Sequence, residues 1–507
     1  MTKVLDRSLS ETIARAAPAR AASVRALSDA AQRGPFRPQV WLNARQRQTA
    51  RLAPHAFRLV DVIGVSLLTA ACVVAAPGAV AAAPLASVTP LIVGAIAILG
   101  LMRTTGLYSF PADRGPAAHI AIACALAAIG AGLAWLTARL LGAASVMTTS
   151  WLGLVPVAVV MLQALWSLMI HRWRAFGALT PNVVLVGATR DAEGLIRLAL
   201  QRRDINVLGV FDDRLARTPD AIVGVPVLGR ASDLLTHPMA PYVDRIVVAI
   251  DPRAQARVRE LTAQLAGLPN EVTLLVDPEN PGEQAAALDR LARTSLSPLD
   301  GPVDHDRRAF DKRLQDLVVG ALALIALAPV MALTALAIKL DGPGPVFFRQ
   351  RRHGFNQEEI VVWKFRTMRP EAADATAARQ VTADDDRVTR VGRLLRSTSL
   401  DELPQLLNVL SGEMSLVGPR PHAIGMKTGR IESARLVADY AHRHRIKPGM
   451  TGWAAIKGSR GPMHTPADVR RRVSLDIEYI ERQSTWLDLW IMLVTIPVLL
   501  GDRSAVR

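Results

Sequence analysis

Four long runs of apolar residues dominate the first third of the chain, at about residues 57–76, 84–102, 117–138 and 150–171. Each run is close to the roughly 20 residues that a helix needs to cross a bilayer. Arginines stand before the first run, between the second and third, and after the fourth, whereas the link between the first and second is uncharged. Positive charge stays on the cytoplasmic side. The pattern therefore predicts a four-span bundle over 57–174 with both ends in the cytoplasm.

The segment before the first run has a different composition. Residues 1–56 are rich in Ala, Arg and Ser and carry no apolar stripe of helical length. No apolar core follows the first few residues, so a secretory signal peptide is not expected. We predict a disordered basic tail over 1–56.

Beyond the fourth run, short β-branched runs alternate with helix-like stretches. The runs are NVVLVGA (182–188), NVLGVFDD (206–213), DRIVVAI (244–250) and EVTLLVD (271–277), with helix-like stretches at 191–203 and 253–267. This alternation predicts a doubly wound parallel sheet, a Rossmann-like domain over 180–300. A dinucleotide-binding turn has the pattern GxGxxG, but Gly187, Thr189 and Ala192 occupy its three positions. We favour a structural or regulatory domain, with nucleotide binding as the alternative.

A fifth apolar stretch, at 314–340, has Pro329 at its centre. A proline removes a helix hydrogen bond and kinks or breaks the helix there. Arginines and lysines flank the stretch on both sides, which indicates that both of its ends face the cytoplasm. We therefore predict a re-entrant membrane helix over 311–341 in preference to a straight span.

Composition supports a membrane protein. Half of the residues are apolar, and the mean hydropathy of +0.23 is high for a soluble protein. The net charge of +16 suits either nucleic acid or an anionic membrane surface. No basic stretch is interleaved with aromatic residues that would stack on bases, so we expect a membrane and no nucleic acid. Cys72 and Cys124 lie in apolar runs without metal-ligand neighbours, which excludes a CxxC zinc site.

Candidate chemistry is concentrated between residues 341 and 460, a region dense in Gly, Pro, Arg and Asp. Adjacent Asp401 and Glu402 precede Pro404 and an apolar helical stretch. A carboxylate pair at a helix start is favoured by the helix dipole, so the pair by itself indicates only a helix N-terminus.

The arginines around this pair change its interpretation. Arg396 lies just upstream, and Arg420 stands between two prolines that restrict its backbone. Arginine suits bidentate contact with phosphate. A carboxylate nucleophile, a metal and fixed arginines are what phosphoryl transfer needs.

Motifs along residues 306–500 resemble the bacterial sugar transferase family, the monotopic polyprenyl-phosphate phosphoglycosyl transferases. The motifs are GPVFFRQRRHG (344–354), KFRTM (364–368), RSTSLDELPQLLNVLSGEMSLVGPRP (396–421), KPGMTGW (447–453) and LDIEYI…STWLDL (475–489). Four spans followed by a nucleotide-fold-like domain are similar to the large members, which prime polysaccharide and O-antigen synthesis.

The resemblance implies roles for particular residues. Asp401 matches the nucleophile and Glu402 the Mg²⁺ ligand. Arg396 and Arg420 match arginines that contact phosphate, and the segment from Pro419 to Pro421 matches the part linked with the donor nucleotide.

Other residues are lesser candidates. Lys364 and Arg366 match positions that approach the lipid phosphate, with surface charge over anionic lipid as the alternative. Asp476 is a lesser metal candidate, with a helix-surface carboxylate as the alternative. The family's membrane helix commonly breaks at Ser-Pro, whereas this chain has Ala328 before Pro329.

Together these inferences predict a membrane α-helical bundle, an α/β Rossmann-like domain and an α/β catalytic domain over 306–507 with a re-entrant helix. By resemblance, the chain transfers a hexose-1-phosphate, with glucose favoured over galactose, from a UDP-sugar to undecaprenyl phosphate. It would use Mg²⁺, release UMP, and act in exopolysaccharide, capsule or O-antigen synthesis.

We expect a multi-pass protein of the bacterial inner membrane with both non-membrane domains in the cytoplasm, and leave a homodimer open. Two rivals remain, a membrane-tethered NAD-dependent oxidoreductase acting on nucleotide sugars and a non-catalytic scaffold for polysaccharide assembly.

Overall fold

The computed structural model describes most of the chain. The described residues are 42–75, 85–111, 114–202, 205–250, 254–265, 267–275, 305–369, 385–428, 431–433, 436–461, 463 and 465–501. They fall into two compact units, one of them Arg47–Leu179 and the other containing Trp41–Gln46 and everything from Thr180 onward. Most of the predicted basic tail lies outside the described residues. Helix α3 covers Ala44–Arg51, and the first of the long apolar helices starts at Ala53. The last part of the predicted tail is therefore helical, so the tail prediction extended too far.

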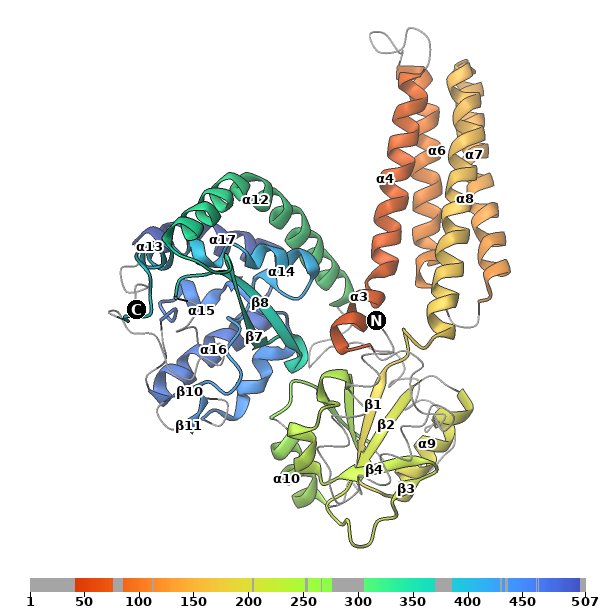
Figure 1. Cartoon of the computed structure of the whole chain (residues 1–507). Coiled ribbons are helices and arrows are strands. Elements are labelled where there is room, and N and C mark those ends of the chain that lie inside the picture. The colour runs from red at the N-terminus through yellow and green to blue at the C-terminus, as the bar shows by residue number, and fades with distance from the viewer. Residues whose placement is uncertain are drawn as a thin grey trace. The chain divides into compact units, whose positions relative to one another are not determined.

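Four long helices form the first unit, and Figure 1 shows them side by side. They are α4 (Ala53–Val74), α6 (Leu85–Thr104), α7 (Pro116–Leu140) and α8 (Val146–Ala175), with a short 3₁₀ turn, η3 (Leu107–Ser109), between α6 and α7. Each is long and apolar enough to cross a membrane. Side chains such as Ile98 and Trp151 are buried between the helices, whereas Leu67 and Met161 point outward. Exposed apolar side chains on all four helices suit a lipid environment.

Two glycines set the distance between α6 and α7. A Cβ on Gly130 would lie 2.3 Å from Cγ1 of Ile98, and one on Gly94 would lie 2.7 Å from the Cβ of Ala134. Small residues let helix backbones approach closely in membranes. The bundle therefore depends on glycine at these two positions for its packing.

The Rossmann-like domain contains a six-stranded sheet of order β3-β4-β2-β1-β5-β6. The strands are β1 (Asn182–Val186), β2 (Asn206–Phe211), β3 (Ala221–Ile222), β4 (Val225–Gly229), β5 (Arg245–Val248) and β6 (Glu271–Leu274). Helices α9 (Arg190–Arg202) and α10 (Gln255–Leu265) and the short 3₁₀ turns η4 (Ala231–Thr236) and η5 (Ala240–Tyr242) complete the described part of the domain.

Both faces of this sheet are buried. On β1, Val183 and Leu185 belong to one apolar cluster and Val184 and Val186 to another. Burial on both faces is typical of parallel strands, which explains their unbroken apolar sequences. All four predicted strands are present and pair in parallel, whereas the antiparallel pair β3–β4 was not predicted.

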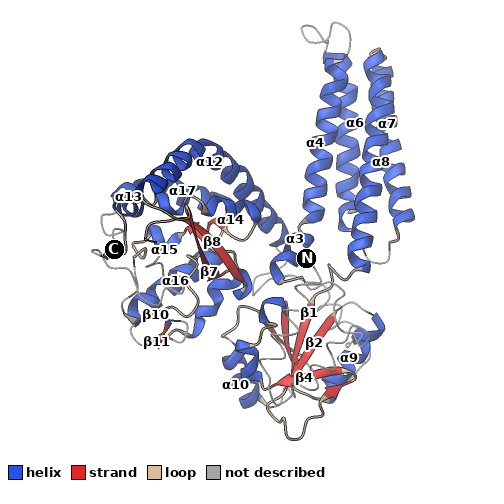
Figure 2. Ribbon diagram, viewed as in Figure 1, coloured by secondary structure: helices blue, strands red, loops and turns tan. Residues whose placement is uncertain are grey.

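The described part of the catalytic domain predicted from 306 onward is mainly helical, with three pairs of short strands. Its helices are α12 (His305–Asp341), α13 (Arg390–Thr398), α14 (Gln405–Ser411), α15 (Trp453–Ile456), α16 (Pro466–Arg482) and α17 (Thr485–Gly501). Its strands are β7 (Phe347–His353), β8 (Glu359–Phe365), β9 (Ser415–Val417), β10 (Lys427–Thr428), β11 (Ile431–Glu432) and β12 (Gly449–Thr451). Figure 2 shows how few strands this domain has beside its helices.

The β7–β8 hairpin ends in a tip that contacts the Rossmann-like domain. Asn356, in the tip turn η6 (Phe355–Gln357), adopts a left-handed backbone with φ of 52°, which asparagine tolerates better than most residues. Its side-chain nitrogen donates to the backbone oxygen of Val243 at 3.1 Å, and its side-chain oxygen accepts from Asn270 at 3.0 Å. The hairpin that carries candidate site residues is therefore anchored in the neighbouring domain.

Helix α12 is continuous through Pro329 and curves over the catalytic domain (Figure 1). Both of its ends are fastened to that domain. Near its start, Arg313 donates to the backbone oxygens of Val409 at 2.6 Å and Leu410 at 2.7 Å. Near its end, Arg366 donates to backbone oxygens of the final turn and the residues just after it.

The outward face of α12 is apolar and exposed, with Leu322, Ile325 and Leu333 each more than 60% accessible. Its inward face packs on two apolar clusters of the catalytic domain, through Leu324 and Leu327 in one and Ile338 in the other. This arrangement places an apolar ridge on one surface of the domain.

We predict opposite effects for two glycine-to-alanine changes on α7. Gly130→Ala should destabilise the bundle by about 1–3 kcal/mol, because the added methyl group overlaps Ile98. Gly132→Ala should be neutral or slightly stabilising, since nothing lies within 4 Å of the added Cβ and alanine favours helix. Melting temperatures in detergent measure the difference. Equal melting temperatures would contradict the predicted contact between α6 and α7.

Candidate active site

The acidic pair lies in a tight turn between α13 and α14. Thr389 caps α13 by accepting a hydrogen bond from the Gly392 amide at 2.9 Å. The helix ends at Ser399, whose φ of 57° is left-handed, and the 3₁₀ turn η8 (Leu400–Glu402) follows. Arg460 donates to the Ser399 hydroxyl at 2.5 Å. The turn is thereby held in the conformation that presents both carboxylates.

Glu402 is bound by two cations. Lys364 of β8 donates to Glu402 Oε1 at 2.8 Å, and Arg420 donates to Oε1 at 2.5 Å and to Oε2 at 3.2 Å. Burial acts to raise the pKa of Glu402, but the charges and hydrogen bonds of Arg420 and Lys364 outweigh burial and hold this pKa well below its usual range. Glu402 is therefore a permanently ionised carboxylate that fixes both cations.

Asp401 differs from its neighbour. Within the described part of the chain, its carboxylate accepts no hydrogen bond and forms no ion pair. Burial raises its pKa above the usual value, the charge of Lys364 opposes the rise, and the charge of Glu402 adds to it. A raised pKa makes the carboxylate oxygen more basic, and an unpartnered oxygen is open to a substrate. Of the two acids, Asp401 is the one available to react.

Arg420 is held by its backbone as well as by Glu402. Its carbonyl oxygen accepts from Arg443 at 2.7 Å, and the carbonyl of Pro421 accepts from Arg352 at 2.5 Å. Arg352 also donates to the side-chain oxygen of Gln350 at 2.6 Å. Burial, with a smaller contribution from Arg420, lowers the pKa of Arg352 to about 10, so its guanidinium keeps its charge at neutral pH.

A glycine on strand β12 and another just after strand β9 bring the segment before Arg420 close to a second backbone. A Cβ on Gly449 would lie 2.0 Å from the Gly418 nitrogen, which only glycine permits. The Gly449 amide donates to the Pro419 oxygen at 2.9 Å. The segment from Pro419 to Pro421 is therefore packed closely against strand β12.

The structure places Arg366 at the end of helix α12. Its guanidinium donates to three carbonyl oxygens, those of Pro343 at 2.6 Å, Gly342 at 2.7 Å and Ile338 at 3.0 Å. The last carbonyls of a helix lack intrahelical partners, and Arg366 satisfies them. Arg366 therefore fastens the end of α12, and its contact with the lipid phosphate stays a prediction.

Asp476, the lesser metal candidate, lies inside the domain and not on a helix surface, so the alternative of a surface carboxylate is wrong and metal binding stays a prediction. Asp476 is buried and pairs with buried Arg443 at 2.8 Å. Arg443 in turn contacts His422, whose Nδ1 lies 2.6 Å from the Tyr440 hydroxyl. Asp476 thus neutralises the arginine that holds the Arg420 backbone. Sequence reasoning missed Arg443, because only the fold brings it to that carbonyl.

Arg396 lies in the group that surrounds the acidic pair. Its Nε donates to the Thr367 hydroxyl at 2.9 Å, and its charge acts on Asp401. With Lys364, Arg352 and Arg420, four cationic side chains surround two carboxylates, a surplus of two positive charges. Such a surplus suits a substrate diphosphate.

The carboxylates also fit Mg²⁺. This ion is commonly held by one or two carboxylates together with substrate phosphates and water. Glu402 Oε2 has a single contact, at 3.2 Å, and keeps capacity for another partner. No group of three or more His, Cys, Asp or Glu that could enclose a metal occurs among the described residues. Mg²⁺ binding at Glu402, with Asp401 beside it, stays a prediction that these two carboxylates fit.

The first turn of the Rossmann-like sheet is occupied by the protein itself. The carboxylate of Asp212 accepts hydrogen bonds from the amides of Ala188 and Arg214, both at 2.7 Å. In a dinucleotide-binding domain this turn would face a pyrophosphate. Here an internal carboxylate uses the first amide after Gly187, which disfavours the rival reading as an NAD-dependent oxidoreductase.

Comparisons with known proteins agree with this geometry. Residues 307–502 match the family described as "Bacterial sugar transferase", and residues 110–275 match one described as "CoA-binding domain". The exopolysaccharide production protein PSS of Rhizobium leguminosarum bv. phaseoli is 48% identical over 185 residues, 36% of this chain and 92% of that protein. The chain belongs to the bacterial sugar transferase family.

Two longer relatives of this sugar transferase are named for a glucose phosphate. The undecaprenyl-phosphate glucose phosphotransferase of Komagataeibacter xylinus is 36% identical over 363 residues, 71% of this chain and 66% of the relative. The UDP-glucose:undecaprenyl-phosphate glucose-1-phosphate transferase of Escherichia coli (strain K12) is 40% identical over 269 residues, 53% of this chain and 57% of the relative. The matched part thus spans less than two thirds of each. The likeness to a CoA-binding domain confirms a Rossmann-like fold after the bundle.

We predict that Arg366 acts on stability. Arg366→Gln should destabilise the catalytic domain by about 2 kcal/mol or more, because several carbonyls at the end of α12 lose a charged donor. Arg393→Gln is the matched control, since Arg393 lies exposed on α13. Thermal unfolding of the purified full chain measures both. If the two variants melt together, Arg366 does not fasten the helix.

Proposed function

We propose that this sugar transferase moves a hexose-1-phosphate from a UDP-sugar to undecaprenyl phosphate in two displacements at Asp401. The observation that carries the proposal is the division between the two acids. Glu402 is bound by Lys364 and Arg420, while Asp401 is unpartnered among the described residues and surrounded by cations. A free carboxylate beside a fixed cationic cluster is equipped to attack a phosphorus atom.

In the first displacement, an Asp401 carboxylate oxygen attacks the phosphorus that bears the sugar. The bond from that phosphorus to the bridging oxygen breaks, and UMP leaves with the electron pair. Asp401 then holds the sugar phosphate as an acyl phosphate. Arg420 and Arg396 neutralise charge on the diphosphate, and the segment from Pro419 to Pro421 contacts the nucleotide part of the donor.

In the second displacement, a phosphate oxygen of the lipid attacks the same phosphorus. The bond to Asp401 breaks, its carboxylate is regenerated, and the product is a lipid diphosphosugar. Neither displacement requires a base, because an ionised carboxylate and an ionised phosphate monoester are already nucleophiles. Mg²⁺ held by Glu402 together with the diphosphate would supply further charge neutralisation.

The identities of donor and acceptor rest on the relatives. Both longer relatives are named for glucose and undecaprenyl phosphate. We therefore propose UDP-glucose as the donor and undecaprenyl phosphate as the acceptor. The product would prime synthesis of an exopolysaccharide, capsule or O-antigen.

A re-entrant α12 would bring the site to the lipid. Arg313 and Arg366 fasten both ends of α12 to one polar domain, and the exposed face between them is apolar. A helix whose ends rest on the same domain cannot place them on opposite sides of a bilayer. We propose that the ridge of α12 enters the cytoplasmic leaflet and that both non-membrane domains are cytoplasmic.

Replacing the nucleophile tests the chemistry. Asp401→Asn should reduce UMP release from UDP-glucose and undecaprenyl phosphate at least about a thousandfold, because an amide cannot form the acyl phosphate. Asp386→Asn removes an exposed carboxylate nearby and should keep activity. UMP is measured in membranes that contain each variant. A fully active Asp401→Asn variant would favour the scaffold rival over an enzyme.

Cysteine labelling tests the path of α12. In a chain with Cys72 and Cys124 replaced by serine, Arg308→Cys and Asp341→Cys should both react with an impermeant maleimide in inside-out vesicles only. Ala144→Cys, between α7 and α8, should react in right-side-out vesicles only. Labelling of residues 308 and 341 from opposite faces would show a straight span.

A further inference from the structure

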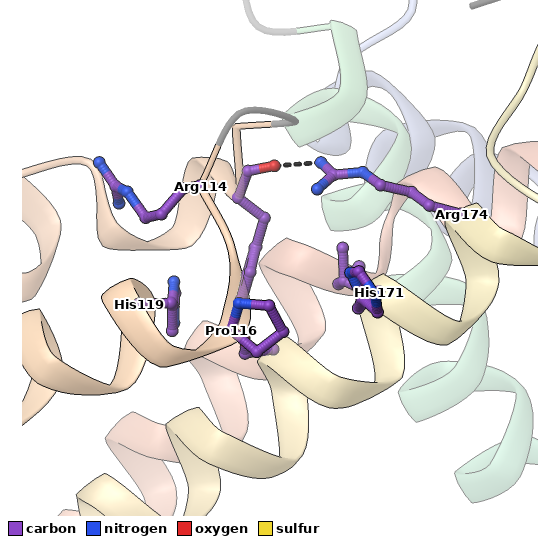
Figure 3. Close-up of a pocket in the computed structure, with 8 residues that line it drawn as sticks. Arg114, Pro116, His119, His171 and Arg174 are labelled. Atoms are coloured by element: carbon purple, nitrogen blue, oxygen red, sulfur yellow. Dashed lines mark hydrogen bonds between the residues drawn. The ribbon is translucent and has the colours of Figure 1, made fainter. Parts of the chain in front are cut away.

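A small cavity lies at one end of the four-helix bundle, between the start of α7 and the last turns of α8 (Figure 3). Arg114, His119, His171 and Arg174 are among its lining residues, and none of the lining side chains is acidic. In the view of Figure 3, Arg114 and His119 lie on one side of Pro116 and His171 and Arg174 on the other. The cavity is therefore surrounded by cationic and titratable side chains from two helices.

One hydrogen-bond donor of the Arg114 guanidinium has no acceptor in the described part of the protein. Its Nη1 atom is buried and has no hydrogen-bond partner among the described residues. Leaving a buried donor of a charged group unpaired is costly, so such a donor indicates a missing acceptor. A guanidinium is best satisfied by an anion with several oxygens.

Arg174 fixes the opposite wall of the cavity. Its guanidinium donates to the carbonyl oxygen of Phe110 and lies 3.4 Å from that of Pro111, in the link between α6 and α7. These bonds hold the link against α8 while the positive charge of Arg174 remains at the cavity. The guanidinium of Arg174, held in place by these bonds, therefore forms part of the cavity wall, and this part of the wall does not depend on a mobile surface side chain.

His119 is oriented by a chain of buried polar groups. The carboxylate of Asp61 can only accept, so the Gln163 side chain turns its nitrogen toward Asp61 at 2.6 Å. The Gln163 oxygen then faces His119 Nε2 at 3.0 Å, which requires a proton on that nitrogen. Trp166 and Tyr108 also donate to Asp61, at 2.9 and 2.7 Å.

Burying a network of polar groups within membrane-spanning helices costs free energy, so we expect this network to have a function. It leaves the histidine ring fixed at the cavity wall, stacked on Phe110 with 4.7 Å between ring centroids. His119 and Arg114, which carries the unpartnered donor, both line the cavity. The proposed catalytic residues belong to the other unit, so this is a separate site.

The size and place of the cavity limit its ligand. Its enclosed volume of about 10 Å³ is close to that of one water, so it admits one oxygen of a larger group. Its residues stand where two spans end, at the level of lipid headgroups. We propose that this cavity binds the phosphate group of a membrane lipid, whose hydrocarbon tails lie along the apolar outside of the bundle.

The test uses the full chain in nanodiscs of neutral phosphatidylcholine, with Arg420→Gln as background to weaken the proposed catalytic phosphate site. Native mass spectrometry follows retention of added dioleoyl phosphatidic acid and of undecaprenyl phosphate. Arg114→Gln should weaken retention of at least one of these lipids about tenfold, the loss of one charge-assisted hydrogen bond. His171→Gln, at the exposed mouth, should weaken it about threefold.

Matched controls distinguish lipid binding at this site from general electrostatic attraction between the protein and anionic lipids. Arg139→Gln removes an exposed arginine at the other end of α7 and should leave retention unchanged. Arg114→Lys keeps the charge and should retain most binding, which guards against misfolding of the glutamine variant. Equal retention by the Arg114→Gln and Arg139→Gln variants would overturn the site. Displacement of the lipid by millimolar inorganic phosphate would identify the free anion as ligand and overturn the lipid assignment.

Discussion

The ion cluster around Glu402 is the interaction on which the rest of the catalytic domain depends. Glu402 joins three segments that are distant in sequence, since Lys364 comes from strand β8, Arg420 from the proline-flanked segment after β9, and Glu402 from the turn after α13. Removing one member of such a half-buried cluster leaves the charges of the others without a partner. For a buried ion pair, this loss lowers the free energy of unfolding by about 3–5 kcal/mol. Because Glu402 neutralises part of the cationic charge and fixes its position, Asp401 has no partner among the described residues and lies beside cations that a diphosphate can use.

The same domain explains why this chemistry belongs at a membrane. The proposed acceptor carries its reactive phosphate on a hydrocarbon chain that stays in the bilayer, so the nucleophile must come to the surface. Helix α12 offers an apolar outer face, and Arg313 and Arg366 fasten its two ends to the domain that holds Asp401. In the proposed function, the exposed apolar side of α12 brings the site to the lipid. The hairpin tip at Asn356 then links the domain to the Rossmann-like sheet.

Patterns with a strong local signal were predictable from sequence. The four long apolar helices of the first unit and the parallel strands β1, β2, β5 and β6 follow from the pattern of apolar residues, which is a property of neighbouring residues. The acidic pair and the segment around Arg420 were found through motifs. Contacts between distant residues were not predictable, and these decide what Arg366 and Asp476 do. Arg366 shares a motif with Lys364, yet one points to helix carbonyls and the other to Glu402. Strand β3 has only two residues and so lacks the length of a recognisable strand pattern, and Pro226 interrupts the apolar run of β4.

The covalent intermediate is the central claim, and it can be observed directly. Purified protein is incubated with UDP-glucose and Mg²⁺ in the absence of any lipid acceptor, and intact and peptide masses are then determined. The account predicts release of about one equivalent of UMP and a hexose-phosphate adduct on the peptide that contains Asp401, because the first displacement needs no acceptor. UMP release that occurs only when donor and lipid are present together, with no adduct on Asp401, would contradict it.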